Sequence, residues 1–359
     1  MSFIIQGPKG ERKIGENEPC FIIAEMSANH AQDYEKAVKM MHAIKAAGAD
    51  AVKLQTYTPD DMSLDCKKEW FLVGGKDNPE AWKGKTFYDL YKEALTPWEW
   101  HADLQKLANE LGLVFFSAAY APETVDLLET LDIPCYKIAS YECNDDMLLK
   151  RVAQTGKPII MSVGFASEEE IEHALEVLKK NGAKEIAVLY CVTSYSEKPT
   201  LEDTNLRTMW DIAKKFNVMV GFSDNNYGVE IPILAADMGA TIIEKHFVLS
   251  ENNTTALDGR FSLKEEEFKH MVDTIREHEQ MKGKVNYGTQ NNAEAYNKQF
   301  RRSLFVVKDM KAGESFSAEN VRSLRPAAGL APRHYEEILG KKAKVDIERG
   351  TPLSFDIIA

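Results

Sequence analysis

The sequence lacks the features that mark membrane-spanning and secreted proteins. Its longest apolar runs, such as residues 21–24 and 242–243, are far shorter than the roughly 20 residues that span a bilayer. The amino terminus has no basic segment followed by an apolar stretch, so we expect no secretory signal. The five cysteines are widely spaced and form no C-x-x-C pair, which predicts buried, reduced thiols and a cytoplasmic protein.

Positive charge is also scarce. The chain has 44 lysines and arginines against 56 aspartates and glutamates, a formal net charge of −12. General electrostatics therefore disfavour a nucleic-acid partner. An anionic small molecule would need a local group of basic side chains and backbone N–H groups. Basic residues inside apolar segments are thus the first candidates for a binding site.

What the sequence does contain is a repeated unit of apolar strand, polar loop and amphipathic helix. We expect eight strands, at residues 21–25, 51–56, 114–117, 135–140, 158–163, 186–192, 218–223 and 241–246. Helix signals lie between them: a periodic segment at 33–47, a cap at Thr96 followed by a stop at Gly112, and a capping box that opens at Ser167. Eight such units predict an α/β fold, a (β/α)8 TIM barrel. A doubly wound open sheet is the competing architecture.

The composition and the pattern of expected elements change after the last long helix. We expect a barrel domain over residues 1–282, a linker rich in Asn, Gln, Lys and Gly over 283–298, and a small, mainly β domain over 299–359. A long polar insertion at residues 62–85 is expected to form a loop over one mouth of the barrel.

Catalytic groups of (β/α)8 barrels lie at the carboxyl ends of the strands. Two lysines, Lys53 and Lys137, stand among apolar strand residues, where an unpaired ammonium group is costly. Serines stand at three other strand ends. Together these residues predict an oxyanion or phosphate site. The structural alternative is that each lysine pairs with a barrel carboxylate such as Glu25 or Glu142.

The strand-end segments resemble those of the sialic acid synthase (nonulosonic acid synthase) family. The likeness covers nearly the whole chain, through residues 21–25 with 29–30, 48–56, 136–140 with Glu142, 221–224 and 243–247. Residues 322–326 and 329–330 resemble the family's antifreeze-like (SAF, β-clip) domain. Within the family, residues 56–60, 87–91 and 96–100 are most similar to pseudaminic acid synthases.

The resemblance implies a transferase that uses phosphoenolpyruvate. C3 of phosphoenolpyruvate would join the open-chain aldehyde of an acetamido-hexose, water would add at C2, and phosphate would leave. The sugar remains open among the precursors of pseudaminic, legionaminic and N-acetylneuraminic acid. The resemblance also implies a homodimer whose C-terminal domains are swapped onto the partner's active site, and a divalent metal, usually Mn²⁺.

The resemblance further implies roles for individual residues. Phosphoenolpyruvate would be bound by Lys53, Lys137, Ser140, Ser162 and Ser223. The sugar would be bound by Gln55, Tyr195, Asp258 and Arg325, with the arginine supplied by the partner subunit. The catalytic residues would be Glu25, Glu142 and His246, and the metal would lie at His246 and Asn225. By itself, His246 is as well explained as a packed or capping residue.

One departure from the family pattern matters for the metal. The family places a histidine after Ser-Asp, whereas this chain has Asn225, whose carboxamide is a weaker ligand for manganese than imidazole. A relative that binds phosphoenolpyruvate or sugar with impaired catalysis is therefore an alternative hypothesis. A Schiff-base aldolase that uses Lys53 or Lys137 is another.

Overall fold

Eight parallel strands close into a barrel in the computed structural model, which describes residues 1–74, 82–195, 200–252 and 256–359. The strands are β3 (Phe21–Glu25), β4 (Ala51–Thr56), β5 (Val114–Ala119), β6 (Tyr136–Ile138), β7 (Ile159–Ser162), β8 (Ile186–Val192), β9 (Met219–Asp224) and β10 (Ile242–His246). Strand β10 pairs with both β9 and β3, so the sheet has no open edge. The predicted (β/α)8 barrel is confirmed, and the open doubly wound sheet is excluded.

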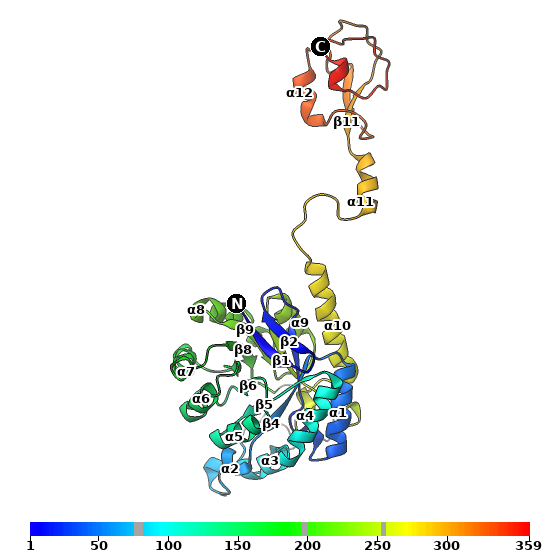
Figure 1. Cartoon of the computed structure of the whole chain (residues 1–359). Helices are drawn as coiled ribbons and strands as arrows, with labels where there is room; N and C mark the ends of the chain where they lie inside the picture. Colours follow the sequence, from blue (N-terminus) through cyan, green and yellow to red (C-terminus); the bar gives the residue numbers. More distant parts are fainter. Residues whose placement is uncertain (75–81, 196–199, 253–255) are drawn as a thin grey trace. The chain divides into compact units, whose positions relative to one another are not determined.

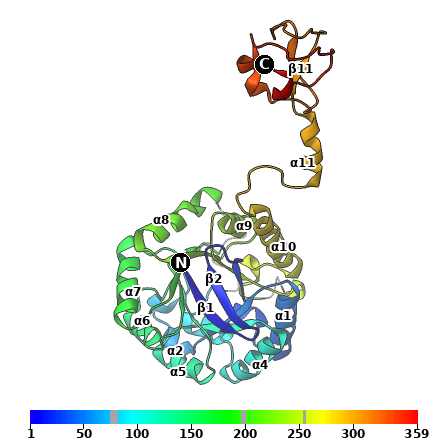
Figure 2. The same ribbon diagram turned by 45° about the horizontal axis from the view of Figure 1, so that its top comes forward.

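Helices surround the barrel, as Figures 1 and 2 show. They are α1 (Tyr34–Ala46), α2 (Pro59–Met62), α3 (Phe87–Ala94), α4 (His101–Leu111), α5 (Pro122–Thr130), α6 (Asp146–Ala153), α7 (Glu168–Lys180), α8 (Arg207–Phe216), α9 (Glu230–Asp237) and α10 (Glu265–Lys282). The capping box at the start of α7 is confirmed, because the Ser167 hydroxyl accepts the Glu170 N–H and the Glu170 carboxylate accepts the Ser167 N–H. Helix α4 ends at Gly112, whose φ of 69° suits glycine.

The predicted helix cap at Thr96 is wrong. A 3-10 turn over Trp98–Trp100 precedes α4, which begins only at His101. The Thr96 hydroxyl instead lies 3.0 Å from Nε2 of His30, and both side chains are buried. A contact between distant parts of the chain therefore takes the side chain that the local pattern assigned to the helix.

An antiparallel hairpin that the sequence did not reveal precedes the barrel. It consists of β1 (Ser2–Gly7) and β2 (Gly10–Gly15), and it buries Phe3, Ile5 and Ile14 in the barrel core. Gly7 packs closely against Val114, the first residue of β5, which places the hairpin at the amino ends of the strands. Figure 2 shows the hairpin lying across the barrel. Access to the barrel interior is therefore left to the carboxyl ends of the strands.

The predicted insertion at residues 62–85 lies only partly within the described residues, since 75–81 fall outside them. A 3-10 turn over Glu69–Phe71 and an antiparallel bridge between Leu72 and Thr86 shape the described part. Met62, Val73 and Trp82 from this segment line the pocket described below. The insertion thus contributes to one mouth of the barrel.

The chain divides after Lys282 into two compact units, Met1–Lys282 and Gly283–Ala359. The second unit contains α11 (Asn292–Asn297), within the segment expected to be a linker, and then β11 (Ser303–Val306), β12 (Val321–Leu324) and α12 (Tyr335–Ile338). Isolated antiparallel bridges and a separate apolar core complete this mainly β unit. Among the described residues, each helix is too short or too polar to cross a bilayer.

Candidate active site

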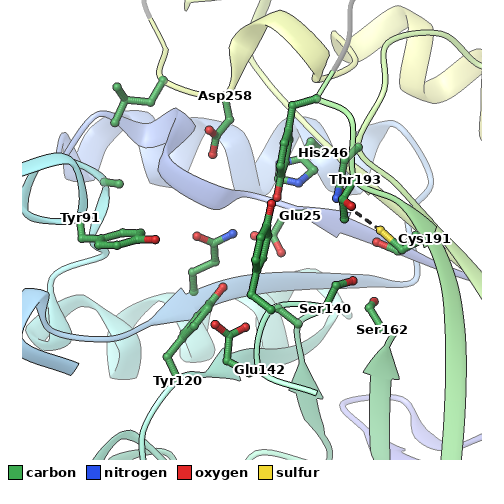
Figure 3. A pocket seen from close by; sticks show the side chains of 18 of the residues that line it. Glu25, Tyr91, Tyr120, Ser140, Glu142, Ser162, Cys191, Thr193, His246 and Asp258 are labelled. Carbon is green, nitrogen blue, oxygen red and sulfur yellow. Dashed lines mark hydrogen bonds between the residues drawn. The ribbon is translucent and has the colours of Figure 1, made fainter. Parts of the chain in front are cut away.

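A pocket of about 490 Å³ lies at the carboxyl ends of the barrel strands. Glu25, Ser162 and His246, each the last residue of its strand, all line it. In Figure 3 these side chains share one space with Ser140, Glu142 and Asp258. The volume suits small-molecule substrates, and the location is the one that a (β/α)8 barrel predicts.

Two buried lysines meet inside this pocket. Lys53 on β4 forms an ion pair with Glu25 Oε2, and its Nζ lies 3.6 Å from Glu244 Oε2. Lys137 on β6 places its Nζ 3.7 Å from Glu244 Oε1. The two residues are only 3% and 1% exposed. The ammonium groups therefore face the same side of the barrel wall and share one carboxylate, Glu244.

Both lysines pair with barrel carboxylates, as the structural alternative expected. Lys53 pairs with Glu25, and Lys137 pairs with Glu244 on β10. Both lysines nevertheless line the pocket. Although burial opposes it, Glu244 and Glu25 raise the pKa of Lys53 and so favour its ammonium form, whereas burial lowers the pKa of Lys137 even beside Glu244. A Schiff-base lysine must present a neutral amine.

Hydroxyl groups surround the lysines. Lys137 Nζ donates to Ser162 Oγ at 2.7 Å and to the Ile138 carbonyl at 3.0 Å. Ser223 Oγ donates to Glu244 Oε1 at 2.9 Å, and Ser140 Oγ accepts the backbone N–H of Gly164 at 3.2 Å. All five residues expected to bind phosphoenolpyruvate line this one pocket. Such a set of ammonium and hydroxyl donors suits a phosphate or carboxylate group.

Glu244 is a pocket residue that the sequence pattern did not mark as part of the site. It lies two residues before His246 on β10, so the strand period places both side chains on the same face of the sheet. That spacing was the available signal. Although burial opposes ionisation, Lys137 and Lys53 hold the pKa of Glu244 below its ordinary value.

The other carboxyl groups of the pocket bind protons more tightly than usual. Burial raises the pKa of Glu142 to about 7, and its Oε2 is buried with no hydrogen-bond partner among the described residues. Burial also raises the pKa of Glu25 despite its pairing with Lys53, and it raises the pKa of Asp258. Asp258 accepts a hydrogen bond from the Ser27 hydroxyl. Glu142 can thus hold or release a proton near neutral pH.

His246 and Asn225 lie next to each other at the strand ends. Asp224 pairs with Lys245 across β9 and β10, so the residues that follow are neighbours. His246 Nδ1 is buried without a hydrogen-bond partner among the described residues, and burial lowers the pKa of the ring to about 3, with help from Lys53. The Asn225 amide donates to Cys191 Sγ at 3.4 Å. The imidazole is therefore neutral, and the carboxamide is engaged with a thiol.

A buried ion pair fixes the backbone that carries Asn225. Lys245 Nζ lies 2.7 Å from Asp224 Oδ2 and also donates to the Asn226 carbonyl. The Asn226 N–H donates to Asp224 Oδ1 at 3.1 Å, and the Ser194 hydroxyl donates to the Asn226 side chain. These contacts connect the ends of β8, β9 and β10.

The residues expected to bind the sugar lie in two places. Gln55, Tyr195 and Asp258 line the pocket. Arg325 belongs to the second unit, where it follows β12 and is exposed. Aromatic rings that the sequence analysis did not select form much of the pocket wall: Tyr57 meets Tyr91 and Tyr120 edge-on, with ring centroids 5.7 and 5.2 Å away. Such rings can pack on the apolar faces of a sugar.

Family models and curated relatives match this chain over most of its length. Residues 40–287 match the NeuB family, and residues 301–359 match the SAF domain. A pseudaminic acid synthase of Campylobacter jejuni is 43% identical over 334 residues, which cover 93% of this chain and 95% of that protein. An N,N'-diacetyllegionaminic acid synthase of Legionella pneumophila is 31% identical over 353 residues, 97% of each protein.

A solved structure supports the same relationship. The crystal structure of an N-acetylneuraminic acid (sialic acid) synthetase from Leptospira borgpetersenii, in complex with citrate, matches with a TM-score of 0.69 and 28% sequence identity. The match covers 83% of this chain and 96% of that one.

Proposed function

Since the chain belongs to the NeuB family, we propose that it condenses phosphoenolpyruvate with the open-chain aldehyde of an acetamido-hexose, as a pseudaminic acid synthase. The observation that carries this proposal is the convergence of Lys53 and Lys137 on one pocket, which Ser140, Ser162 and Ser223 also line. The greater identity to a pseudaminic than to a legionaminic acid synthase favours the pseudaminic product. Legionaminate and N-acetylneuraminate synthases are the alternatives within the family.

The lysines and serines form the cradle for phosphoenolpyruvate. This substrate carries a phosphate and a carboxylate, and both need cationic or hydroxyl donors in a dry pocket. Lys53 and Lys137 supply the positive charge, while Ser140, Ser162 and Ser223 supply hydroxyl groups. In a chain of net charge −12, this local group accounts for how an anion can bind.

The bond changes of this reaction require two proton transfers, which carboxyl groups of the pocket can carry out. The π electrons between C2 and C3 form the new bond from C3 to the aldehyde carbon, whose oxygen takes a proton. The oxygen of water then bonds to C2 and loses one proton. The C2–O bond to phosphate breaks as the remaining hydroxyl proton passes to the phosphate, which leaves a ketone at C2. Glu142 donates the proton to the aldehyde oxygen, since its pKa is about 7. Glu25 receives the proton from water.

The sugar lies between the reacting centre and the pocket wall. Gln55, Tyr195 and Asp258 offer it hydrogen-bonding groups, and neutral His246 offers the aldehyde end an imidazole. Arg325 completes the site from the partner subunit of a homodimer with swapped C-terminal domains. A cytoplasmic location is consistent with five unpaired cysteines.

The metal expected from the resemblance fits poorly. His246 offers an unpartnered buried nitrogen, but its neighbour Asn225 replaces a second imidazole and donates to Cys191. Among the described residues, no three His, Cys, Asp or Glu side chains are arranged to hold a metal ion. The Mn²⁺ site at His246 and Asn225 therefore stays a prediction, and no step above depends on it.

The poor metal site favours a second candidate function. A relative that binds phosphoenolpyruvate or sugar with impaired turnover would show the same pocket with Asn225 in place. Restoring the histidine separates the two candidates. A large gain from no activity in Asn225→His supports the impaired relative, and a small change in an already active protein supports the synthase.

A phosphate-release assay tests the proposed function directly. The protein is incubated with phosphoenolpyruvate, Mn²⁺ and each precursor hexose of pseudaminic, legionaminic and N-acetylneuraminic acid. We expect phosphate and a nine-carbon acid to appear in equal amounts, fastest with the pseudaminic precursor. If none of the three sugars releases phosphate, the synthase proposal fails.

A further inference from the structure

Glu244 occupies the centre of the anion site. Its Oε2 lies 3.6 Å from Lys53 Nζ, and its Oε1 lies 3.7 Å from Lys137 Nζ and accepts the Ser223 hydroxyl at 2.9 Å. These three partners are all residues that we assign to phosphoenolpyruvate. The residue is 5% exposed, and Oε2 has no hydrogen-bond partner among the described residues.

The barrel places this carboxylate between strands that do not pair with each other. Glu244 on β10 stands opposite Ser223 of β9 and Ile23 of β3, whereas Lys53 comes from β4 and Lys137 from β6. One side chain on the inner face therefore reaches two ammonium groups from separate strands. Strand pairing alone does not bring these lysines together.

The two lysines depend on Glu244 to different degrees. Lys53 has a second ion pair with Glu25. Lys137 donates to two neutral acceptors, the Ser162 hydroxyl and the Ile138 carbonyl. Among the residues that the structure describes, Glu244 is the carboxylate within ion-pairing distance of Lys137. Loss of Glu244 would leave Lys137 buried among neutral partners.

We propose that Glu244 is the positioning residue of the anion site: it holds the ammonium groups of Lys53 and Lys137 in one place and keeps Lys137 charged before the anion binds. The proposal rests on the proposed function only for the identity of the anion. Separations of 3.6 and 3.7 Å are ion pairs longer than a hydrogen bond. An ammonium group has three N–H donors, so Lys137 retains one for the incoming anion.

The charges around Lys137 give the expected direction of the pH effect. Burial lowers the pKa of Lys137, Glu244 acts most strongly against this, and Lys53 lowers the pKa further. The ionisable groups that face Lys137 or interact with it are Lys53 on β4, Glu25 on β3, Cys191 on β8, Glu244 and His246 on β10, and Glu142 after β6. Without Glu244, the ammonium form is lost at a lower pH. Affinity for anions must then fall at a lower pH as well.

The test measures binding of inorganic phosphate, and separately of phosphoenolpyruvate, by calorimetry from neutral to alkaline pH with the full chain. For Glu244→Gln we expect the alkaline loss of phosphate affinity to begin at least about one pH unit lower than in the unchanged protein, because one pKa unit is a tenfold change in protonation. KM for phosphoenolpyruvate rises about tenfold at mildly alkaline pH, while kcat changes less.

Two further variants separate positioning from general damage. Glu244→Asp keeps the charge but shortens the side chain. It should therefore bind phosphate more weakly, while the pH at which phosphate affinity is lost (the alkaline limit) stays that of the unchanged protein. This variant tests the proposal even if the glutamine variant does not fold. Glu129→Gln removes a carboxylate that pairs with Lys157 at 3.0 Å outside the pocket, and it should leave phosphate binding unchanged.

The outcomes distinguish this proposal from the proposed function. An unchanged alkaline limit in Glu244→Gln overturns the role of Glu244, and so does an aspartate variant whose limit shifts as the glutamine variant's does. Phosphate binding that depends on Glu244, without condensation of any sugar, supports the role of Glu244 while the synthase proposal fails. If Glu244→Gln still condenses the sugar and loses phosphate affinity at the same alkaline pH as the unchanged protein, the synthase proposal stands and the role of Glu244 fails.

Discussion

The ammonium group of Lys137 on β6 donates a 2.7 Å hydrogen bond to the hydroxyl of Ser162 on the neighbouring strand β7. Register explains the contact: Ile138 pairs with Met161, so Ser162 lies just beyond the end of β6. The lysine is thereby directed towards the carboxyl ends of the strands. The charge that forms a buried ion pair with Glu244 is therefore also presented to the pocket.

Replacing Lys137 by methionine should remove half of the positive charge that we assign to phosphoenolpyruvate. We expect kcat/KM for phosphoenolpyruvate to fall by about a hundredfold or more, the cost of losing one buried anion donor. Steady-state kinetics measure the effect. Lys157→Met is the matched control, because Lys157 pairs with Glu129 and Asp132 outside the pocket. Equal losses in the two variants would contradict the assignment.

The pKa of Glu142 makes the proposed proton donation depend on pH. Below about pH 7 the carboxyl group is protonated, and above it the proton is lost. If Glu142 is the donor, kcat/KM for the sugar should be highest below that value and fall about tenfold per pH unit above it. Glu142→Gln should remove this dependence and lower the rate. A variant that keeps the alkaline decline would exclude Glu142 as its source.

The same carboxyl group should affect stability. Its pKa is raised from 4.5 to about 7 in the folded protein, so the folded state binds the proton more tightly than the unfolded chain. The stabilising contribution is present at acid pH and is lost as the pH rises through about 7. Glu142→Gln should therefore have a higher Tm than the unchanged protein at alkaline pH and a similar Tm in acid. Scanning calorimetry at both pH values checks this.

We predict that Asn225 weakens the binding of a metal ion in the pocket. The amide donates to Cys191 at 3.4 Å, and imidazole is a better ligand for transition metals than carboxamide. We expect Asn225→His to bind Mn²⁺ about tenfold more tightly or better, as measured by calorimetry. Asn109→His, on the exposed face of α4, is the control for adding an imidazole. Tight Mn²⁺ binding by the unchanged protein would refute the poor fit.

The buried pair of Lys245 and Asp224 should matter for stability. Both side chains are almost fully buried, with Nζ and Oδ2 2.7 Å apart. Lys245→Met leaves a carboxylate buried without its partner, which costs about 3–5 kcal/mol. The double variant Asp224→Asn with Lys245→Met should recover much of that loss, because no buried charge remains. Urea unfolding measures both, and a loss below about 1 kcal/mol in the single variant would show that the pair is not needed.

The order of elements was readable from the sequence because its signals are local. Apolar segments of strand length, separated by amphipathic helices, predicted all eight barrel strands, and three of them with the observed bounds: 21–25, 51–56 and 186–192. The strand period also placed Lys53 and Gln55 on one face, and both line the pocket. The hairpin over residues 2–15 was missed, because its buried face contributes only Phe3, Ile5 and Ile14.

Partners across the barrel were not readable in this way. Thr96 had the local signature of a helix cap, yet it contacts His30, which is 66 residues away in sequence. Glu25 and Glu142 were the carboxylates named as possible lysine partners, but Lys137 pairs with Glu244, 107 residues away in sequence. The thiol that engages Asn225 belongs to Cys191, 34 residues earlier in the chain. A single sequence contains no record of such contacts.

The sequence alone therefore determined the repeating β/α units and which polar residues stand at strand ends, since short-range periodicity and capping chemistry encode both. Only the closed barrel decided which of these residues meet. Pairing of β10 with β3 brings the last strand beside the first, and that closure sets Glu244 between lysines that lie 84 residues apart in the chain. The physical reason is that a buried charged group pairs with an opposite charge that is close in the folded structure, and such a group can be far away in the sequence.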